Sequence, residues 1–301
     1  MYILFISKSH RQKEVNFLLV ARFSEWYSFN IWEVMFEDND KYRAPALDKG
    51  LDIMELLSSH DDGLSQKEVA IALGRSQGEI YRMLSTLVRR DYVTYFTSSD
   101  RYTLSLKMFS VSQKHPPINR LIGIALPMMR RASRTTWQSC HIGMESNGDI
   151  VIVSSVESPG NWSVALKTGS VVGLWNTGTG RVLSTYRSEV EREDLISHHR
   201  QVIGEPKLVR SEFDAHMKRI KRVGFEHMPS ATAVGVTNIA FPIFNPDGIA
   251  LAVLSCPFVE RLDDVEVPSQ EITIKIFSDL AKELTTFYCG GGEMPYQLRV
   301  V

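Results

Sequence analysis

The segment from Gly74 to Arg90 carries a clear pattern of apolar and polar positions at helical spacing. One face repeats at the i, i+3, i+4, i+7, i+8 spacing of a buried stripe, with Ile80, Met83, Leu84, Leu87 and Val88. The opposite face carries Tyr81, Arg82, Ser85 and Arg89. Ser76 precedes Glu79 by three residues, the spacing of a capping box, so the helix is expected to begin just after Ser76. The outer face is therefore either a solvated side of a core helix or a surface that contacts another molecule.

Shorter elements of compatible pattern flank this helix. Residues 45–60 predict a helix whose inward residues are expected to be Leu47, Leu51, Met54 and Leu57. Ser65 and Glu68 form a second capping box before a short helix with an apolar face of Val69, Ala70 and Leu73. The stretches "YVTYFT" and "YTLSL" alternate like two strands joined by "SSDR". Three helices followed by a hairpin predict a winged helix-turn-helix over residues 44–112.

A winged helix-turn-helix suggests double-stranded DNA as the partner. Between Ser65 and Lys107 there are seven basic side chains against four acidic ones, a modest excess that a dimer would double. We expect Gln77, Tyr81 and Arg82 to lie nearest the base edges, since Gln and Arg offer bidentate patterns to adenine and guanine. Gly78 would let the DNA approach closely. Ser65, Gln66, Arg75 and Arg101 are expected to contact phosphates. Ser76, at the start of the helix, is also expected to be among the DNA-binding residues.

The second half of the chain mixes strands and helices. A linker helix is expected over residues 113–130, starting near Pro116, with Pro127 either kinking it or starting a new helix. Hairpins are predicted at Asn147-Gly148 and between Asn245 and Gly248. Helices are predicted from Thr179, over 211–224 with Phe213, Met217 and Ile220 inward, and over 271–288, and a Glu-rich segment over 188–199 lies between the first two. The pattern predicts an α+β domain over 131–290, a sheet with helical cover, followed by a tail over 291–301.

Composition narrows the class of protein. The 301 residues are 44% hydrophobic with a net charge of −1, which argues against a membrane-surface protein but not against a local basic patch. The three cysteines form no C-x-x-C pair, so a reducing, cytoplasmic setting is expected, with neither disulfide framework nor metal site. We interpret residues 1–40 as an N-terminal extension, with Met35 as a possible alternative start; an extra packed helix is the competing explanation.

The order of these segments resembles the IclR family of bacterial transcriptional regulators. "SQKEVAIALGRSQGEIYRMLSTLVRRDYV" and "RYTLSLKMF" resemble its reading head and wing, and "HPPINRLIGIALPMM" resembles its linker. "QSCHIGMESNGDIVIVSSVESPG", "KTGSVVGLWNTGTGRVLSTY" and the strands up to Pro257 resemble its effector domain. The likeness covers roughly residues 41–290. It implies a GAF-like antiparallel sheet with helices as effector domain, and a homodimer or dimer of dimers.

The stretch "NTGTGR" is the candidate effector loop. A glycine-containing loop that runs into a helix directs backbone N–H groups and the positive dipole end at an anion, although an ordinary cap through Thr177 or Thr179 also fits. The resemblance implies that Gly178, Thr179, Asn238 and Ser255 contact an effector. Arg181 departs from the family's usual lysine, and Trp175 either walls the pocket or is an ordinary buried aromatic residue.

No catalytic constellation is found in the sequence. Cys140 and His141 are neighbours in an expected strand, so they face opposite sides, and His198 and His199 lack the i, i+4 spacing of a helical metal pair. The sequence therefore predicts a regulator, not an enzyme, that needs no cofactor. The resemblance to the IclR family implies a palindromic operator, repression as the commoner mode of action and, together with the "NTGTGR" loop, a small organic acid as the ligand. The alternative is a small-molecule sensor that acts through a protein partner.

Overall fold

The computed structural model describes residues 43–263 and 265–289 of the chain. The interpretations of residues 1–40 and 291–301 lie outside these residues. The chain divides between Val111 and Ser112 into two compact units. In the described part of the chain, no helix is both long enough and apolar enough to cross a bilayer.

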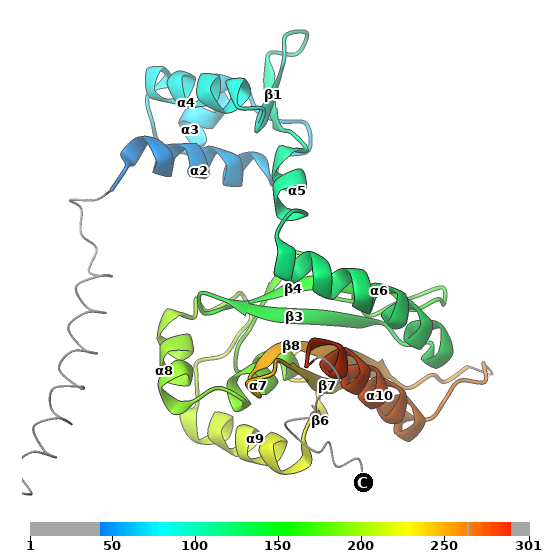
Figure 1. Cartoon of the computed structure of the whole chain (residues 1–301). Helices are drawn as coiled ribbons and strands as arrows, with labels where there is room; N and C mark the ends of the chain where they lie inside the picture. The colour runs from blue at the N-terminus through cyan, green and yellow to red at the C-terminus, as the bar shows by residue number, and fades with distance from the viewer. Residues whose placement is uncertain (1–42, 264, 290–301) are drawn as a thin grey trace, which may run out of the picture. The chain divides into compact units, whose positions relative to one another are not determined.

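The first unit is a helix-turn-helix followed by a two-stranded antiparallel wing (Figure 1). Its elements are α2 (Pro45–Leu57), α3 (Gln66–Ala72), α4 (Gln77–Arg89), β1 (Val93–Phe96) and β2 (Arg101–Leu104). Both predicted capping boxes are confirmed, because Ser65 accepts from the backbone of Glu68 and Ser76 from that of Glu79, with the reciprocal bonds also present. An isolated antiparallel β-bridge between Leu64 and Tyr102 pairs the segment before α3 with the second strand of the wing.

The core of this unit lies between the three helices and the wing. Its buried residues are Ile53, Leu57, Val69, Ala70, Ile80, Leu84, Val93 and Tyr102. The expectation that Leu47 and Leu51 face inward is wrong: their side chains are 62% and 46% exposed. The buried stripe of α2 is carried by Ile53 and Leu57, one helical turn apart, and the two earlier leucines fall outside it. They form an apolar surface on the outside of the unit.

The second unit contains a six-stranded antiparallel sheet in the order β5-β4-β3-β8-β7-β6, so the predicted α+β class is confirmed. The strands are β3 (Cys140–Ser146), β4 (Asp149–Val156), β5 (Val171–Val172), β6 (Glu226–Pro229), β7 (Val236–Phe244) and β8 (Ala250–Val259). Both predicted hairpins are confirmed by the pairing of Ser146 with Asp149 and of Phe244 with Ala250. Positive φ angles at Asn147 and Gly148 produce the tight turn of the first hairpin.

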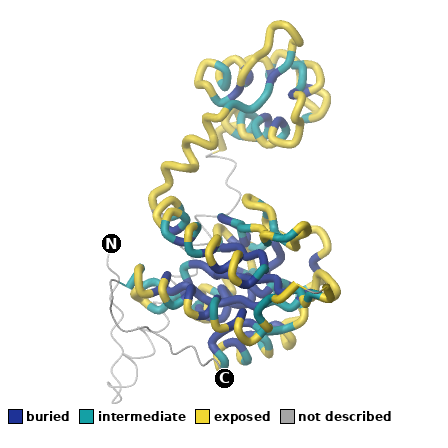
Figure 2. The backbone as a smooth tube through the Cα atoms, turned by 90° about the vertical axis from the view of Figure 1, so that its right-hand side faces the viewer, coloured by how far each residue is buried: buried dark blue, intermediate teal, exposed yellow. Residues whose placement is uncertain are grey.

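Helices cover both faces of this sheet (Figure 1). They are α6 (Pro116–Thr136), α7 (Gly178–Thr185), α8 (Glu189–His198), α9 (Arg210–Val223) and α10 (Gln270–Tyr288), and the short α5 (Lys107–Ser112) precedes them. α6 and α10 pack on one face through a core that includes Leu121, Met129, Phe241 and Phe277. α7 and α9 pack on the other face, with Val182, Phe213, Met217 and Ile220 buried. Figure 2 shows the dark blue strands enclosed in this way, whereas α5 is exposed along its length.

The helix expected over 113–130 begins at Pro116 and continues to Thr136, with Pro127 inside it. A proline ring clashes with the backbone four residues earlier, which here is Gly123 on an exposed side of the helix. No new helix starts at Pro127. The elongated helix packs on the sheet of the second unit, where Ala125, Met129 and Ala132 are buried.

Candidate functional sites

The turn between α3 and α4 is held by residues that were expected to contact DNA. The hydroxyl groups of Ser65 and Ser76 donate to the carboxylates of Glu68 and Glu79, each at 2.9 Å, and accept from the same residues' backbone. Gln66 Nε2 donates to the carbonyl oxygen of Gln77 at 3.0 Å, which ties the two helices together. These three side chains therefore fix the orientation of α4.

The beginning of α4 presents a second group of the expected residues to solvent. Arg75, Gln77, Gly78, Tyr81 and Arg82 are all exposed. Tyr81 is 55% exposed despite its aromatic ring, and a Cβ placed on Gly78 would meet no atom within 4 Å. The inward side of the same helix buries Ile80 and Leu84. The sequence-based division of α4 into a buried and an outward face is thus confirmed.

Arg101 is the first residue of β2, directly after the hairpin turn of the wing. Its guanidinium donates to the carbonyl oxygen of Gly63 at 2.6 Å and lies 3.5 Å from the carboxylate of Glu68. The pKa of Glu68 is lowered mainly by its hydrogen bonds to Ser65, with a smaller contribution from Arg101. The side chain thus connects the wing to the start of α3.

A cavity of about 500 Å³ opens in the second unit between the sheet and the N-terminal end of α7. All four residues expected from the family resemblance line it: Gly178, Thr179, Asn238 and Ser255. The sequence interpretation missed further polar residues of the lining, namely His141, Asn176, Ser230 and Thr232. The alternation of side chains along β3 predicts that His141 and Cys140 lie on opposite faces of the sheet, but it does not predict which residues His141 contacts. Trp175 is half-buried outside the lining, and its indole N–H donates to the carbonyl of Pro206 at 2.6 Å.

A chain of polar contacts lies at the floor of the cavity. The hydroxyl oxygens of Thr179 and Ser255 are 2.9 Å apart, and His141 Nε2 lies 3.4 Å from the hydroxyl of Thr179. His141 pairs directly with Ser255 across β3 and β8, so both side chains point to the face covered by α7. Burial lowers the pKa of His141 to about 4, and the imidazole is therefore neutral at physiological pH.

The cap of α7 is built by Thr177. Its hydroxyl accepts from the backbone N–H of Gly180 at 3.1 Å and donates to the carbonyl of Gly173 at 2.6 Å. The ordinary capping interpretation of "NTGTGR" is therefore correct for Thr177. The next N–H groups, those of Gly178 and Thr179, lie in the first helical turn, where helix geometry supplies no partner. The capped helix start also lines the cavity.

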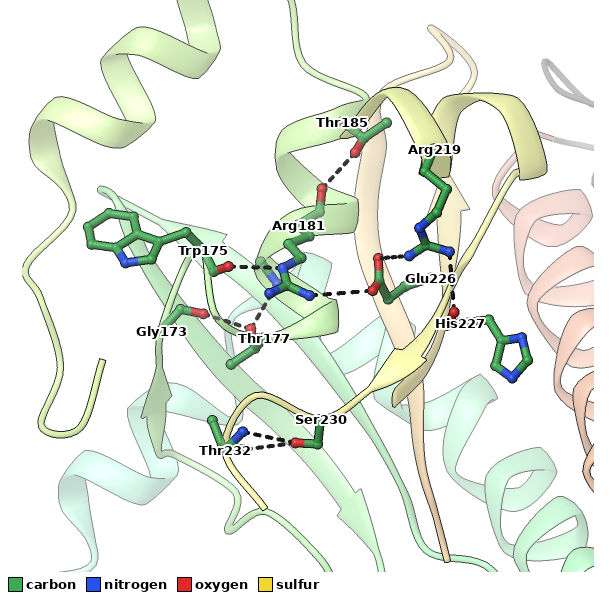
Figure 3. A network of polar contacts seen from close by, with 11 residues as sticks. Gly173, Trp175, Thr177, Arg181, Thr185, Arg219, Glu226, His227, Ser230 and Thr232 are labelled. Atoms are coloured by element: carbon green, nitrogen blue, oxygen red, sulfur yellow. Dashed lines mark hydrogen bonds and ion pairs between the residues drawn. The ribbon is translucent and has the colours of Figure 1, made fainter. Parts of the chain in front are cut away.

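Arg181 contacts this loop but does not line the cavity. Figure 3 shows its polar partners. Its Nε donates to the carbonyl of Trp175 at 2.9 Å, and its guanidinium lies 3.5 Å from the fully buried carboxylate of Glu226. Arg219 approaches the same carboxylate at 2.9 Å. Burial raises the pKa of Glu226, and the two guanidinium groups oppose that shift. The replacement of the family's usual lysine by Arg181 therefore adds no charge to the cavity lining.

Cys140 and His141 lie on opposite faces of the sheet, as the alternation of side chains along a strand predicts. Cys140 lies in the core on the α6 side of the sheet, opposite His141, and burial raises the pKa of its thiol to about 12. Within residues 43–263 and 265–289, no cluster of three His, Cys, Asp or Glu side chains could hold a metal ion.

Comparison with known proteins identifies both units. Residues 118–283 match the family model for the bacterial transcriptional regulator IclR C-terminal domain, and residues 46–95 match the IclR helix-turn-helix domain. The regulator KdgR of Dickeya chrysanthemi is 26% identical over 189 residues, which cover 61% of this chain and 61% of KdgR, less than two thirds of its length. The glycerol operon regulatory protein of Streptomyces coelicolor is 24% identical over 199 residues, covering 66% of this chain and 78% of that protein. An IclR homolog of Microbacterium hydrocarbonoxydans, crystallised with 4-hydroxybenzoate, shares the fold with a TM-score of 0.66 at 16% identity, over 80% of this chain and 98% of that one.

Proposed function

The chain belongs to the IclR family of bacterial transcriptional regulators, and we propose that it represses transcription from a palindromic operator until a small organic acid binds its second unit. The family consists of regulators, not enzymes. The observation that carries the DNA-binding part is the outward face of α4, which a capping box and a buried stripe orient within a winged helix-turn-helix.

We assign base recognition to Gln77, Tyr81 and Arg82, with Gly78 allowing close approach of the major groove. Their exposure at the start of α4 supports this assignment. Arg75 is the proposed phosphate contact. Ser65, Gln66, Ser76 and Arg101 serve mainly to orient α3, α4 and the wing, since each makes internal hydrogen bonds.

The effector in this proposal binds in the cavity lined by Gly178, Thr179, Asn238 and Ser255. The start of α7 supports an acid as the ligand, because unpaired N–H groups and the helix dipole favour an anion there. The 4-hydroxybenzoate complex of the Microbacterium homolog is consistent with an organic acid. Binding would shift the population between arrangements that do and do not fit the operator.

The proposed assembly is a homodimer or a dimer of dimers in the cytoplasm. A palindromic site requires two copies of α4, and the exposed Leu47 and Leu51 on α2 supply an apolar surface for a second copy. In the proposed division, residues 44–112 bind DNA, residues 113–130 link, and residues 131–290 bind the effector.

The proposal is tested by incubating the full-length chain with fragments of its source genome at two salt concentrations and sequencing what is retained. Enrichment of a palindromic site, weakened by salt and released by an organic acid, is expected. A folded protein that enriches no site, with or without candidate acids, would contradict the proposal and favour action through a protein partner.

A further inference from the structure

The cavity in the second unit contains no charged side chain among the described residues that line it. Its polar groups are the hydroxyls of Thr177, Thr179, Ser230, Thr232 and Ser255, the amides of Asn176 and Asn238, and the imidazole of His141. The guanidinium group on α7 is that of Arg181, which donates to the carbonyl of Trp175 and pairs with the carboxylate of Glu226. Any anion in the cavity is therefore held by neutral donors and by the end of a helix.

Such a set of donors suits one carboxylate. A buried carboxylate is costly unless several hydrogen bonds replace its hydration, and the N–H groups of Gly178 and Thr179 with the adjacent hydroxyls supply them. One side chain of the lining, His141, is only 5% exposed and keeps its Nδ1 atom without a hydrogen-bond partner. Buried polar atoms of this kind are uncommon in folded proteins and point to a ligand that completes the polar cluster.

The rest of the lining is aliphatic. Its buried and half-buried members are Ala165, Leu166, Val172, Val202, Val236 and Ile239. A second carboxylate, or a row of hydroxyl groups, would lose its hydration against these side chains without gaining a partner. An apolar body would instead bury its own surface there, and a volume of about 500 Å³ is typical of small-molecule sites.

We infer that the cavity selects a compact monocarboxylate with a largely apolar body, and discriminates against dicarboxylates and polyhydroxylated acids. This inference rests on the proposed effector function and narrows its ligand class. The carboxylate would lie at the start of α7, near Thr179 and Ser255, and the apolar part against the aliphatic wall.

The test uses four ligands that differ in one property each, titrated into the full-length chain by calorimetry. The reference is 4-isopropylbenzoate. Its amide removes the charge, terephthalate replaces the isopropyl group by a carboxylate of similar size, and gluconate replaces the apolar body by hydroxyl groups. The reference is expected to bind at least about tenfold more tightly than each of the other three.

Each other outcome counts against the inference in a distinct way. If terephthalate or gluconate binds as tightly as the reference, regulation by an organic acid survives but the inferred selectivity is wrong. If the amide binds equally well, the start of α7 does not hold a carboxylate. If none of the four binds at millimolar concentration, the inferred class is overturned, while the genomic-fragment experiment still reports separately on DNA binding.

Variants on α7 test the assigned position of the carboxylate. Thr179→Val removes a hydroxyl from the cavity and is expected to weaken binding of 4-isopropylbenzoate about tenfold or more. The matched control is Thr185→Val on the same helix, because that equally buried hydroxyl donates to the carbonyl of Arg181 at 2.7 Å and lies outside the cavity. Unchanged affinity in Thr179→Val, or an equal loss in the folded control, would overturn the position.

Discussion

The hydroxyl oxygens of Thr179 and Ser255 lie 2.9 Å apart, although 76 positions separate the two residues in the chain. Thr179 comes from the first turn of α7 and Ser255 from β8 near the middle of the sheet. The helix can approach the sheet this closely because Gly143 faces it: a Cβ on Gly143 would come within 2.5 Å of the Thr179 methyl group. The floor of the cavity thus depends on close packing of α7 as much as on its polar residues.

The same close packing predicts the effect of Gly180→Ala. A Cβ at this position would overlap the carbonyl group of Leu174, whose carbon would lie only 2.7 Å away, and backbone cannot move aside as a flexible side chain can. We expect a loss of about 1–3 kcal/mol in the free energy of unfolding, measured by urea denaturation, because overpacking strains the loop before α7.

Gly123→Ala on α6 is the control for this substitution. A Cβ there meets nothing within 4 Å, so alanine should stabilise the helix by up to about 1 kcal/mol. Equal stabilisation by both substitutions would show that α7 does not press against Leu174.

Glu226→Gln should be among the most damaging single substitutions in the second unit. The carboxylate is fully buried between Arg181 and Arg219, and its removal leaves two guanidinium groups without their anion. Breaking a buried ion pair on one side costs about 3–5 kcal/mol, which urea denaturation would detect. Glu193→Gln, which breaks a largely exposed pair with Arg210, should change stability by less than about 1 kcal/mol. Similar small losses in both variants would contradict the structural role of Glu226.

The beginnings of α3 and α4 could be predicted from the sequence because they depend on contacts between residues close together in the chain. Ser65 and Ser76 each precede a glutamate by three residues, and a capping box needs no long-range partner, so both helix starts were correctly located. The inward placement of Leu47 failed because helical spacing says which residues share a face, not which face the rest of the protein covers. The bridge between Leu64 and Tyr102 involves a single residue and leaves no periodic signal.

The cavity was only partly predictable. Thr179 and Ser255 were identified through the family resemblance, since no local pattern relates α7 to β8. The place of His141 is set by its pairing with Ser255, a register between strands far apart in the chain, and alternation alone could not supply it. The role of Arg181 depends on its ion pair with Glu226 in β6. The replacement of the family's usual lysine by arginine does not by itself indicate that partner.

Arg82→Ala should weaken operator binding and relax sequence preference. Arginine in the proposed position discriminates guanine by about 1–3 kcal/mol per contact, so affinity should fall at least about fivefold for each half-site. Binding is measured by fluorescence anisotropy on the enriched operator and on a scrambled duplex. Arg222→Ala, which removes an exposed cation from α9, is the charge-matched control. An Arg82→Ala protein with unchanged affinity and preference would refute the proposed docking of α4.

Leu51→Glu should disrupt the proposed dimer. The side chain is 46% exposed on α2 next to Leu47 on the same helical face, and a charge there would oppose burial against a second copy. Sedimentation should show a smaller species, and operator affinity should fall with it. Ile71→Glu on α3 serves as control, because Ile71 is 69% exposed in the same unit. A Leu51→Glu protein that keeps the wild-type mass would exclude this surface as the dimer contact.

His141 should make the second unit lose stability in mild acid. Burial lowers its pKa to about 4 in the folded protein, whereas an unfolded chain has an ordinary histidine pKa near 6.5. Above pH 6.5 the ring is neutral in both states and contributes no pH dependence. Between pH 6.5 and pH 4 the unfolded state takes up a proton that the folded state does not, so stability falls as the pH is lowered. The full difference corresponds to about 3 kcal/mol below pH 4.

His141→Gln removes this proton uptake while keeping a polar group beside Thr179. The loss of unfolding free energy between pH 7.5 and pH 4.5, measured by urea denaturation, should therefore be about 2 kcal/mol smaller in the variant than in the wild type. His216 shifts in the same direction, through burial and the nearby Arg181 and Arg219, so the variant should retain part of the acid sensitivity. His216→Gln should reduce it further, and less than His141→Gln does, because His216 is only partly buried. If His141→Gln keeps the wild-type difference between the two pH values, His141 takes up its proton equally in the folded and the unfolded state, and its burial does not disfavour the charged imidazole.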